Sequence, residues 1–373
     1  MTFLIITHVP HILEQNQCFG YAPYVREMNS WIKQVDKLII VAPVSSSPKT
    51  AIEIQYEHHN IEFVPIESFD ILSLKAIIGS IYKTPRIIYH IYSAMQQANH
   101  IHLRCPGNVG LLGCFIQVLF PDTPKTAKYA GNWDPKSKQP WTYRLQQWIL
   151  SNTFLTRNMQ VLVYGQWEGS SSNIKPFFTA TYAEADKVPL REKSLIAPIR
   201  FVFVGTLVSG KRPLYAIQLF EALYKNGLDV LLTLYGEGTE RNNLEEYIHQ
   251  NNLENRIVLQ GNQPQNVIQK GYEESHFVIL PSQSEGWPKA IAEGMFWGCV
   301  PISTLISCVP FMLDQGNRGV LLTMNLEKDV KQIEAIIEDE VDYQNRRKNA
   351  AEWSRKYTLD FFEQEIKKLI QTK

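Results

Sequence analysis

Residues 276–293 read His276-Phe-Val-Ile-Leu280-Pro-Ser-Gln-Ser-Glu285-Gly-Trp-Pro288-Lys-Ala-Ile-Ala-Glu293. The apolar run before the first proline predicts a buried strand, and the polar residues after it predict a loop. Pro288 suits the first turn of a helix, where its missing N–H costs nothing. Gly286 lets the backbone approach a ligand closely. A strand, a loop and a helix in succession are typical of a βα unit in a parallel sheet.

The same alternation extends in both directions along the chain, which predicts an α/β protein. In the first half we expect strands at Thr2–Thr7, Lys37–Ala42, Ile61–Pro65, His100–Leu103, Lys125–Tyr129 and Val161–Tyr164. In the second half we expect them at Arg200–Gly205, Asp229–Tyr235, Arg256–Leu259, His276–Leu280 and Val300–Ser303. Helices are expected between them, for example at Ala22–Trp31, Gly107–Leu119, Leu214–Lys225, Leu244–Gln250 and Val267–Glu274.

The length of 373 residues fits two domains better than one core. Residues 183–198 are polar, carry mixed charge and contain two prolines, so they are the expected linker. We therefore expect two Rossmann-like domains, at residues 1–190 and 198–350, facing a central cleft with ligands at the carboxyl ends of the strands. The segment 353–371 is expected to be one helix that packs back on the first domain, with Trp353, Tyr357 and Phe361 in a stripe.

Composition excludes several classes of protein. The net charge is zero, which argues against a nucleic-acid binder, and five cysteines without CxxC spacing argue against a disulfide framework or a zinc site. The first residues carry no basic region before a short apolar run, which favours a strand over a signal peptide. The longest apolar stretch, residues 109–120, is too short to span a bilayer. We expect a cytoplasmic location, including the cytoplasmic face of a membrane.

The segment Gly205-Thr-Leu-Val-Ser-Gly210-Lys211-Arg212 follows a predicted strand and opens a helix. It differs by one residue from the phosphate-binding loop pattern GxxxxGK[ST]. Arg212 stands where a magnesium-binding hydroxyl is needed, so hydrolysis of a nucleoside triphosphate is not expected. A glycine turn, backbone N–H groups at a helix start and a lysine can still bind phosphate without a metal. The alternative is a solvated lysine beside an ordinary turn.

Carboxylates at the same edge of the sheet suit sugar or ribose hydroxyls, because hydroxyl groups need acceptors. Glu285 lies on the loop, and Glu293 lies inside the following helix, where a structural glutamate is the alternative. Gly236-Glu-Gly238 lacks the third glycine of a dinucleotide fingerprint, so no nicotinamide cofactor is expected. The chain has no DxD motif flanked by apolar residues and no HExxH or GxSxG. We expect neither a cofactor nor a metal site, and interpret His100 and His102 as packing or substrate contacts.

Taken together, the motifs of residues 200–322 resemble the family 4 retaining glycosyltransferases of GT-B fold. The resemblance rests on an ordered set: Phe-Val-Gly205, Lys211, Tyr-Gly236-Glu-Gly238, Val-Leu-Gln-Gly261, Glu285-Gly-x-Pro…Glu293-Gly-Met-x-x-Gly298-x-x-Pro301, and Val-Pro310…Gly316-x-x-Gly319. It implies a donor site in the second half of the chain. Lys211 would bind the donor diphosphate, Glu293 the ribose hydroxyls, and Glu285 the transferred sugar.

The resemblance also implies the wider set of site residues. The donor site would comprise Gly20, Gly205, Thr206, Lys211, Arg212, Gly236, Gly261, Glu285, Gly286, Trp287, Pro288, Lys289 and Glu293. Thr206 stands where the family usually has an arginine, so phosphate neutralisation would fall more heavily on Lys211. Gly20-Tyr21 occupies the place of the family's glycine pair after the first strand. In such enzymes the departing phosphate is thought to take the acceptor proton, which needs no protein nucleophile; Glu285 as a nucleophile is the alternative.

The first half resembles members that build bacterial surface polysaccharides, through Arg104-Cys-Pro-Gly-Asn108 and Lys128-Tyr-Ala-Gly-Asn132-Trp-Asp134. Acceptor contacts are expected from His102, Arg104, Asn108 and Asn132. The expected function is transfer of a sugar from a nucleotide-diphosphate sugar to a growing, lipid-linked glycan in capsule, O-antigen or exopolysaccharide synthesis. The alternatives are a nucleotide-sugar epimerase of the same fold and a non-catalytic sugar-binding protein.

Charge supports an anionic partner for the first half. Between Asp70 and Glu168 lie ten basic side chains and only two acidic ones, Asp122 and Asp134. Trp141, Leu145, Trp148, Ile149 and Leu155 recur at helical spacing with basic residues nearby, which suggests an amphipathic contact with the inner membrane. An ordinary core-facing helix and a solvated basic face are the alternatives.

Overall fold

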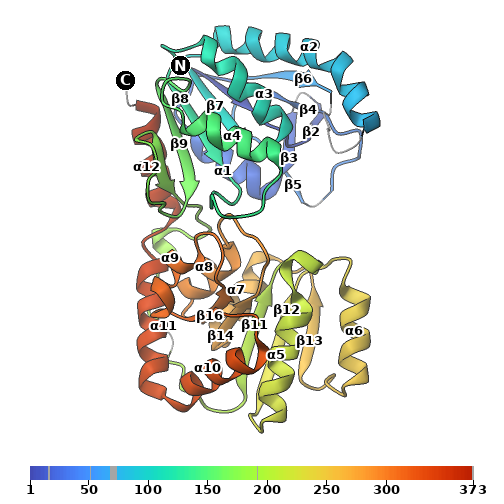
Figure 1. Cartoon of the computed structure of the whole chain (residues 1–373), viewed down its shortest axis with the longest axis vertical. Helices are drawn as coiled ribbons and strands as arrows, with labels where there is room; N and C mark the ends of the chain where they lie inside the picture. Colours follow the sequence, from blue (N-terminus) through green and yellow to red (C-terminus); the bar gives the residue numbers. More distant parts are fainter. Residues whose placement is uncertain (16, 51, 68–73, 191, 372–373) are drawn as a thin grey trace. The chain divides into compact units, whose positions relative to one another are not determined.

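The computed structural model describes the chain except residues 16, 51, 68–73, 191, 372 and 373, and gives only the backbone of residues 74–82. Asp70, one end of the basic segment, therefore lies outside the described residues. The chain forms two compact units (Figure 1). Unit 1 comprises Met1–Phe178 and Phe362–Lys373, and unit 2 comprises Thr179–Phe361. The expected linker, 183–198, lies inside unit 2, and its Arg191 is outside the described residues.

Unit 1 is built on a parallel sheet that has seven strands among the described residues, in the order β10-β9-β8-β7-β1-β4-β6. These are β1 (Thr2–Ile6), β4 (Lys37–Pro43), β6 (Ile61–Ile66), β7 (His100–Cys105), β8 (Lys125–Tyr129), β9 (Met159–Tyr164) and β10 (Ile174–Phe177). The central strands are continuous apolar runs with both faces covered: Phe3 to Ile6 of β1 are fully buried. Each strand expected in this half is confirmed.

The helices of unit 1 are α1 (Ala22–Ile32), α2 (Leu74–Gln97), α3 (Asn108–Ile116) with the 3-10 turn η1 (Gln117–Leu119), and α4 (Trp141–Ser151). Three of them, α2, α3 and α4, connect strands that progress in one direction across the sheet. Right-handed crossovers therefore place these three on the same face. In Figure 1 they lie side by side, and α3 contacts both neighbours.

A small antiparallel sheet, β2 (His11–Glu14), β3 (Gln17–Tyr21) and β5 (Glu53–Gln55), was not predicted. Its strands have three to five residues, too few to show a reliable period. Gly20 belongs to β3 and pairs with His11. It is thus part of a hairpin in unit 1 rather than of a loop directly after the first strand.

Unit 2 contains a second parallel sheet, with six strands among its described residues in the order β13-β12-β11-β14-β15-β16. These are β11 (Ile199–Val204), β12 (Val230–Tyr235), β13 (Ile257–Gly261), β14 (Phe277–Leu280), β15 (Val300–Thr304) and β16 (Val320–Leu322). The α-helices are α5 (Pro213–Lys225), α6 (Arg241–Gln250), α7 (Gln265–Glu274), α8 (Lys289–Phe296), α9 (Val309–Met312), α10 (Leu326–Glu338) and α11 (Glu340–Ser354). Short 3-10 turns are η2 (Glu184–Asp186), η3 (Ser209–Lys211) and η4 (Asp314–Gly316). The expected strands and helices are confirmed here too.

The prediction of one helix over residues 353–371 is wrong. Helix α11 ends at Ser354, and α12 (Leu359–Gln371) begins after a break. Thr358 causes the new start, because its hydroxyl accepts a hydrogen bond from the Phe361 N–H at 3.3 Å, as an N-cap does. Trp353 packs within unit 2, whereas α12 from Phe362 onward belongs to unit 1.

Each parallel sheet has one point where the strand order reverses. In unit 2 the chain runs from β11 outward to β12 and β13, and then from β14 outward to β15 and β16. In unit 1 the corresponding neighbours are β1 and β7. Loops leaving the carboxyl ends of such neighbours go to opposite faces and leave a ligand-sized crevice, which is where open α/β sheets bind ligands.

None of the described helices is long and apolar enough to cross a bilayer.

Candidate functional site

Two loops meet where the strand order of unit 2 reverses. One follows β11 and carries Lys211 in η3, and the other follows β14 and carries Glu285. The Lys211 ammonium group forms an ion pair with the Glu285 carboxylate. The backbone also ties the loops together, since the Gln283 N–H donates to the Gly210 carbonyl at 2.8 Å. The structure thus brings together two residues 74 positions apart that the sequence assigned to one site.

The environment of this pair suits an anion. The Glu285 side chain is 9% exposed and that of Lys211 is 30% exposed, so the lysine is the accessible partner. Arg212 lies next to it at the start of α5, with a left-handed φ of +51° that is uncommon for a residue with a side chain. Thr206 is exposed on the same loop. An anionic group arriving here would meet Lys211 and the first turn of α5.

The glycines of the loop after β12 have a packing role. Gly236 has φ +138°, and a Cβ there would lie 1.9 Å from the Gly205 carbonyl oxygen. A Cβ on Gly238 would lie 2.2 Å from the Leu207 carbonyl oxygen. This loop therefore presses against the loop after β11 and fixes its course. Gly261, at φ +69°, sits beneath Glu237, whose carboxylate oxygen would be 2.8 Å from an added Cβ.

Glu293 lies in α8 and is held from two sides. The Thr181 hydroxyl donates to Oε1 at 2.7 Å, and the Tyr272 hydroxyl donates to Oε2 at 3.3 Å. Burial raises the pKa of this carboxyl, and the hydrogen bond from Thr181 opposes the rise. Trp287, Lys289 and Glu293 line one hollow together with Thr181. In this conformation Glu293 is bonded within unit 2, so a ribose would have to share or replace these partners.

Other residues of the β14–α8 loop are more structural than expected. The Trp287 side chain is buried and stacks on Trp353, with ring centroids 5.9 Å apart. The Gly286 carbonyl accepts from the Cys308 thiol at 3.0 Å, which orients the loop. Pro288 is the N-cap of α8, one position before the expected first turn. Any donor contact from Trp287 would therefore involve its backbone.

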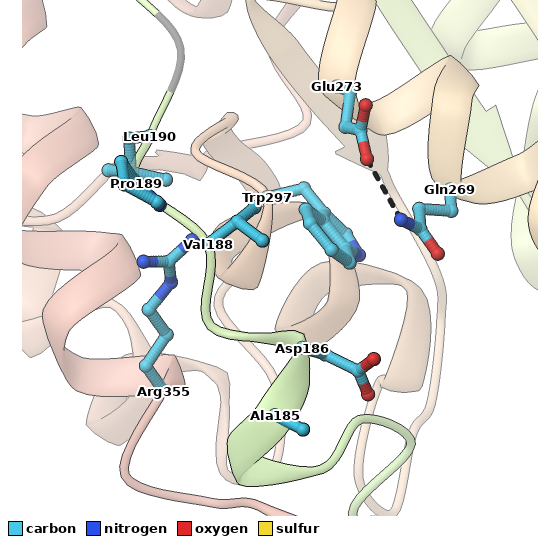
Figure 2. A pocket seen from close by; sticks show the side chains of 9 residues that line it. All are labelled: Ala185, Asp186, Val188, Pro189, Leu190, Gln269, Glu273, Trp297 and Arg355. Atoms are coloured by element: carbon cyan, nitrogen blue, oxygen red, sulfur yellow. Dashed lines mark hydrogen bonds between the residues drawn. The ribbon is translucent and has the colours of Figure 1, made fainter.

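A larger pocket of about 320 Å³ lies elsewhere in unit 2 (Figure 2). Its lining includes Trp297, Arg355 and the hydrogen-bonded pair Gln269–Glu273, whose side chains are 2.9 Å apart. Gln269 lies in the middle of α7 and Glu273 near its end, and Trp297 comes just before β15. These positions belong to the amino edge of the sheet, so the pocket is remote from the two loops and contains none of the expected site residues.

The expected acceptor residues of unit 1 are only partly accessible. His102 is fully buried, with its ring 4.5 Å from that of Trp31, and shares the Thr126 hydroxyl with His100 at 2.9 and 3.0 Å. Burial lowers the pKa of His102 to about 3. The structure therefore makes His102 a core residue, and the acceptor contact expected from it is not supported.

Arg104 is not an uncompensated cation. Its guanidinium donates to Glu27 at 2.9 Å and lies 5.3 Å from the centroid of the Tyr24 ring. Asn108 begins α3, and Asn132 accepts the Asp134 N–H through its side chain in the loop after β8. Both asparagines lie at the carboxyl edge of the unit 1 sheet, as expected from their place after β7 and β8.

The charge argument needs correction as well. Lys128 is fully buried, with its ammonium group 2.8 Å from the Phe178 carbonyl, and Lys125 is 2% exposed. Lys83 pairs with Glu67 at 2.8 Å. Several of the ten cations therefore serve the fold of unit 1. Of the ten cations, Arg86, Lys136, Lys138, Arg144 and Arg157 remain exposed.

His8 was missed by the sequence argument. It lies two residues after the end of β1, at the point where the strand order of unit 1 reverses. Its ring lies against Gly107, where an added Cβ would come within 2.6 Å of Nδ1. Although the residue keeps exposed surface, the atoms packed around the ring partly desolvate it, and this desolvation and the nearby charge of Arg104 lower the pKa of His8. Its place after the first strand of the sheet is the signal that could have identified it.

Comparison with known proteins agrees with this geometry. Residues 187–353 match the family described as Glycosyl transferases group 1. The lipopolysaccharide 1,6-galactosyltransferase of Salmonella typhimurium is 28% identical over 42% of this chain and 44% of its own length. An amylovoran biosynthesis glycosyltransferase of Erwinia amylovora is 28% identical over 41% of this chain and 39% of its own length. The chain covers 23% to 44% of the curated relatives that it matches.

Solved structures share the whole fold. Anabaena HepE in complex with UDP and glucose aligns over 100% of both chains with a TM-score of 0.69 and 14% identity. Sucrose-phosphate synthase from Thermosynechococcus elongatus aligns over 100% of this chain and 98% of its own, with a TM-score of 0.67 and 15% identity. The two parallel Rossmann-like sheets are thus those of the GT-B fold. The match to the glycosyl transferases group 1 family is carried by residues 187–353, all of which lie in unit 2.

Proposed function

We propose that this protein is a retaining glycosyltransferase that moves a sugar from a nucleotide-diphosphate sugar to a growing glycan in surface polysaccharide synthesis. The observation that carries the proposal is the Lys211–Glu285 pair at the point where the strand order of unit 2 reverses. It places one accessible cation and one carboxylate where an α/β sheet binds its ligand. The match of residues 187–353 to the glycosyl transferases group 1 family supports the same reaction.

The donor would lie along the carboxyl edge of unit 2. Lys211, with Arg212 and the first turn of α5, would bind the diphosphate, and Glu285 would accept hydrogen bonds from hydroxyls of the transferred sugar. Glu293 would bind the ribose after exchanging the hydrogen bonds of Thr181 and Tyr272. The loops themselves would be shaped by Gly205, Gly236 and Gly261. The sugar would be approached by backbone groups of Gly286, Pro288 and Lys289.

Gly20 lies in the hairpin of unit 1, and its role at the phosphates stays a prediction.

Chemistry at this site requires charge stabilisation and accurate placement rather than a protein nucleophile. Lys211 stabilises the negative charge that develops on the departing diphosphate, and the phosphate oxygen takes the proton of the attacking hydroxyl. Such preorganised charges give their largest effect in the transition state. Glu285 holds the sugar while the bond to phosphate breaks and the bond to the acceptor oxygen forms on the same face.

We propose a glycan on a lipid diphosphate as the acceptor, held by unit 1 at the cytoplasmic face of the membrane. His8, Asn108 and Asn132 at the carboxyl edge would contact its hydroxyl groups, and Arg104 would contribute beside Glu27. The names of the relatives, which act in lipopolysaccharide and amylovoran synthesis, support a polysaccharide acceptor.

The test is a panel of UDP- and GDP-sugars incubated with the whole chain, with and without lipid-linked oligosaccharide. We expect nucleoside diphosphate to be released in step with sugar transfer, and only when the acceptor is present. Release of nucleotide together with an isomerised sugar, independent of acceptor, would instead establish the epimerase. Nucleotide binding without either reaction would establish a non-catalytic sugar-binding protein.

A further inference from the structure

Exposed phenylalanine and tryptophan side chains of the described residues come from α3, α4 and the turn after α4 in unit 1. Phe115 is 49% exposed, Trp141 68%, Trp148 61% and Phe154 72%. Among the residues whose side chains are described, these are all the exposed phenylalanines and tryptophans. Leaving such side chains in water is unfavourable, and a cluster of them marks a surface that contacts something else.

The elements that carry these side chains are neighbours. Helices α3 and α4 pack against each other on the same face of the sheet (Figure 1). Beyond their ends, the Gln117 side chain donates to the Leu155 carbonyl at 3.0 Å, and Asn158 donates to the Pro121 carbonyl at 3.0 Å. Phe115 and Leu119, from α3 and η1, thus come from the segment that is bonded to the turn carrying Phe154.

Helix α4 separates its two faces cleanly. Trp141, Arg144 and Trp148 recur at a spacing of three and four residues and are exposed, which places them on one face. Ile149 is buried and Leu145 packs against the core of unit 1. The residues that the sequence placed in one amphipathic stripe therefore lie on two different faces of α4. Only its tryptophans point outward, and with Phe115, Leu119 and Phe154 they form what we term the aromatic surface.

Positive charge accompanies the aromatic surface. Lys136, Lys138, Arg144 and Arg157 are exposed, and the Arg157 guanidinium lies 5.0 Å from the centroid of the Phe154 ring. Between Phe115 and Asn158 the sequence has two carboxylates. Asp122 is exposed, and Asp134 accepts a hydrogen bond from the Lys136 N–H at 2.8 Å. Four exposed cations against two carboxylates leave this surface positive.

We propose that the aromatic surface rests on a bilayer with anionic headgroups. Tryptophan rings and arginine stems favour the headgroup region, where an apolar body and a polar tip are both accommodated. The cations add attraction to anionic lipid, and each contributes about fivefold in affinity near the surface. The inference rests on the membrane location in the proposed function and adds the surface of unit 1 that makes the contact; vesicle binding itself requires neither a donor nor an acceptor.

The experiment uses the whole chain and vesicles of phosphatidylcholine with or without 30% phosphatidylglycerol. The chain should sediment with the anionic vesicles and dissociate as salt rises. Brominated lipid should quench tryptophan fluorescence, and the Trp141→Phe/Trp148→Phe variant should lose most of that quenching. Of the other six tryptophans, Trp31, Trp133, Trp287, Trp297 and Trp353 are buried and Trp167 is half-buried, so the signal reports on the two that are exposed.

Two substitution pairs separate the contributions. Trp148→Ala/Phe154→Ala should weaken vesicle binding by about tenfold or more, and Arg144→Gln/Arg157→Gln by about fivefold per charge. Val341→Ala and Lys348→Gln, both exposed on unit 2, are matched controls that should leave binding unchanged. Because all of these side chains are exposed, the melting temperature should stay within a few degrees of that of the unsubstituted chain.

The proposal is overturned if the chain does not bind anionic vesicles, or if it binds them equally well in the aromatic and control variants. It is also overturned if the chain forms a dimer that the aromatic substitutions dissociate, since the surface would then join two copies. Transfer to a water-soluble acceptor distinguishes this failure from that of the proposed function. This transfer should persist in every one of these variants, even where vesicle binding is lost.

Discussion

Replacement of Lys211 by alanine tests the donor site most locally. Lys211→Ala removes the accessible cation of the pair and leaves the Glu285 carboxylate, only 9% exposed, without it. The diphosphate then loses a charge-assisted hydrogen bond and meets a carboxylate instead. Both effects act in the same direction, so affinity for nucleoside diphosphate should fall.

The size of the loss follows from the competition between Glu285 and phosphate for one lysine. A charge-assisted hydrogen bond contributes about 1.5–3 kcal/mol, which corresponds to about 10- to 150-fold in affinity. Two unit charges 4 Å apart interact by about 4 kcal/mol at an effective dielectric constant near 20, so an unpaired carboxylate close to phosphate is a comparable penalty. Glu285→Gln should therefore leave affinity unchanged or raise it, and should restore part of the loss in the double variant.

Titration calorimetry with UDP and with GDP on the four proteins measures this coupling directly. Lys331→Ala is the matched control, because Lys331 also pairs with a glutamate, Glu327, at 2.7 Å but on the surface of α10. The affinity of the Lys331→Ala variant for UDP and GDP should equal that of the unsubstituted chain. If Lys211→Ala binds both nucleotides within twofold of the unsubstituted chain, Lys211 is not in the site and the reasoning fails.

Three further predictions address other parts of the account. Transfer should survive excess EDTA, because Lys211 and helix N-termini meet the diphosphate charge; loss of activity that magnesium or manganese restores would contradict this. His8→Gln should lower kcat/KM for the acceptor without changing nucleotide affinity, as calorimetry and initial rates with His249→Gln as control would show. The depressed pKa of His102 stabilises the fold above pH 6.5, and this stabilisation is lost as the pH falls toward 3, by about 3 kcal/mol at pH 4.5. Urea unfolding at pH 6.5 and at pH 4.5 should show that the free energy of unfolding depends less on pH in His102→Gln than in the unsubstituted chain.

The sequence predicted the parallel strands because buried strands are continuous apolar runs, of which Phe277–Leu280 is typical. It did not predict β2, β3 and β5, whose pairing is tertiary and whose length gives no period. The sequence also did not predict the break before α12, because the apolar stripe of residues 353–361 continues across it at helical spacing. Only the hydroxyl of Thr358, acting as a cap, marks the interruption.

At the site, the sequence located both loops, because each follows a strand and opens a helix. It could not show that Lys211 and Glu285 form a pair, since that depends on the pairing of β11 with β14. For the same reason it misjudged Lys125 and Lys128: a lysine in a strand is expected at the surface, yet both are buried. The place of His8 after the first strand was a signal in the sequence, but its position at the reversal of strand order depends on the pairing of β1 with β7.

The central claim is transfer of a sugar with retention of its anomeric configuration. The most direct measurement is NMR spectroscopy of the glycan formed by the whole chain from an α-linked nucleotide sugar and a lipid-linked acceptor. The account predicts an α-glycosidic product, formed in equal amount with the nucleoside diphosphate and strongly reduced in Glu285→Gln. A β-linked product, or free sugar and no glycan, would contradict it.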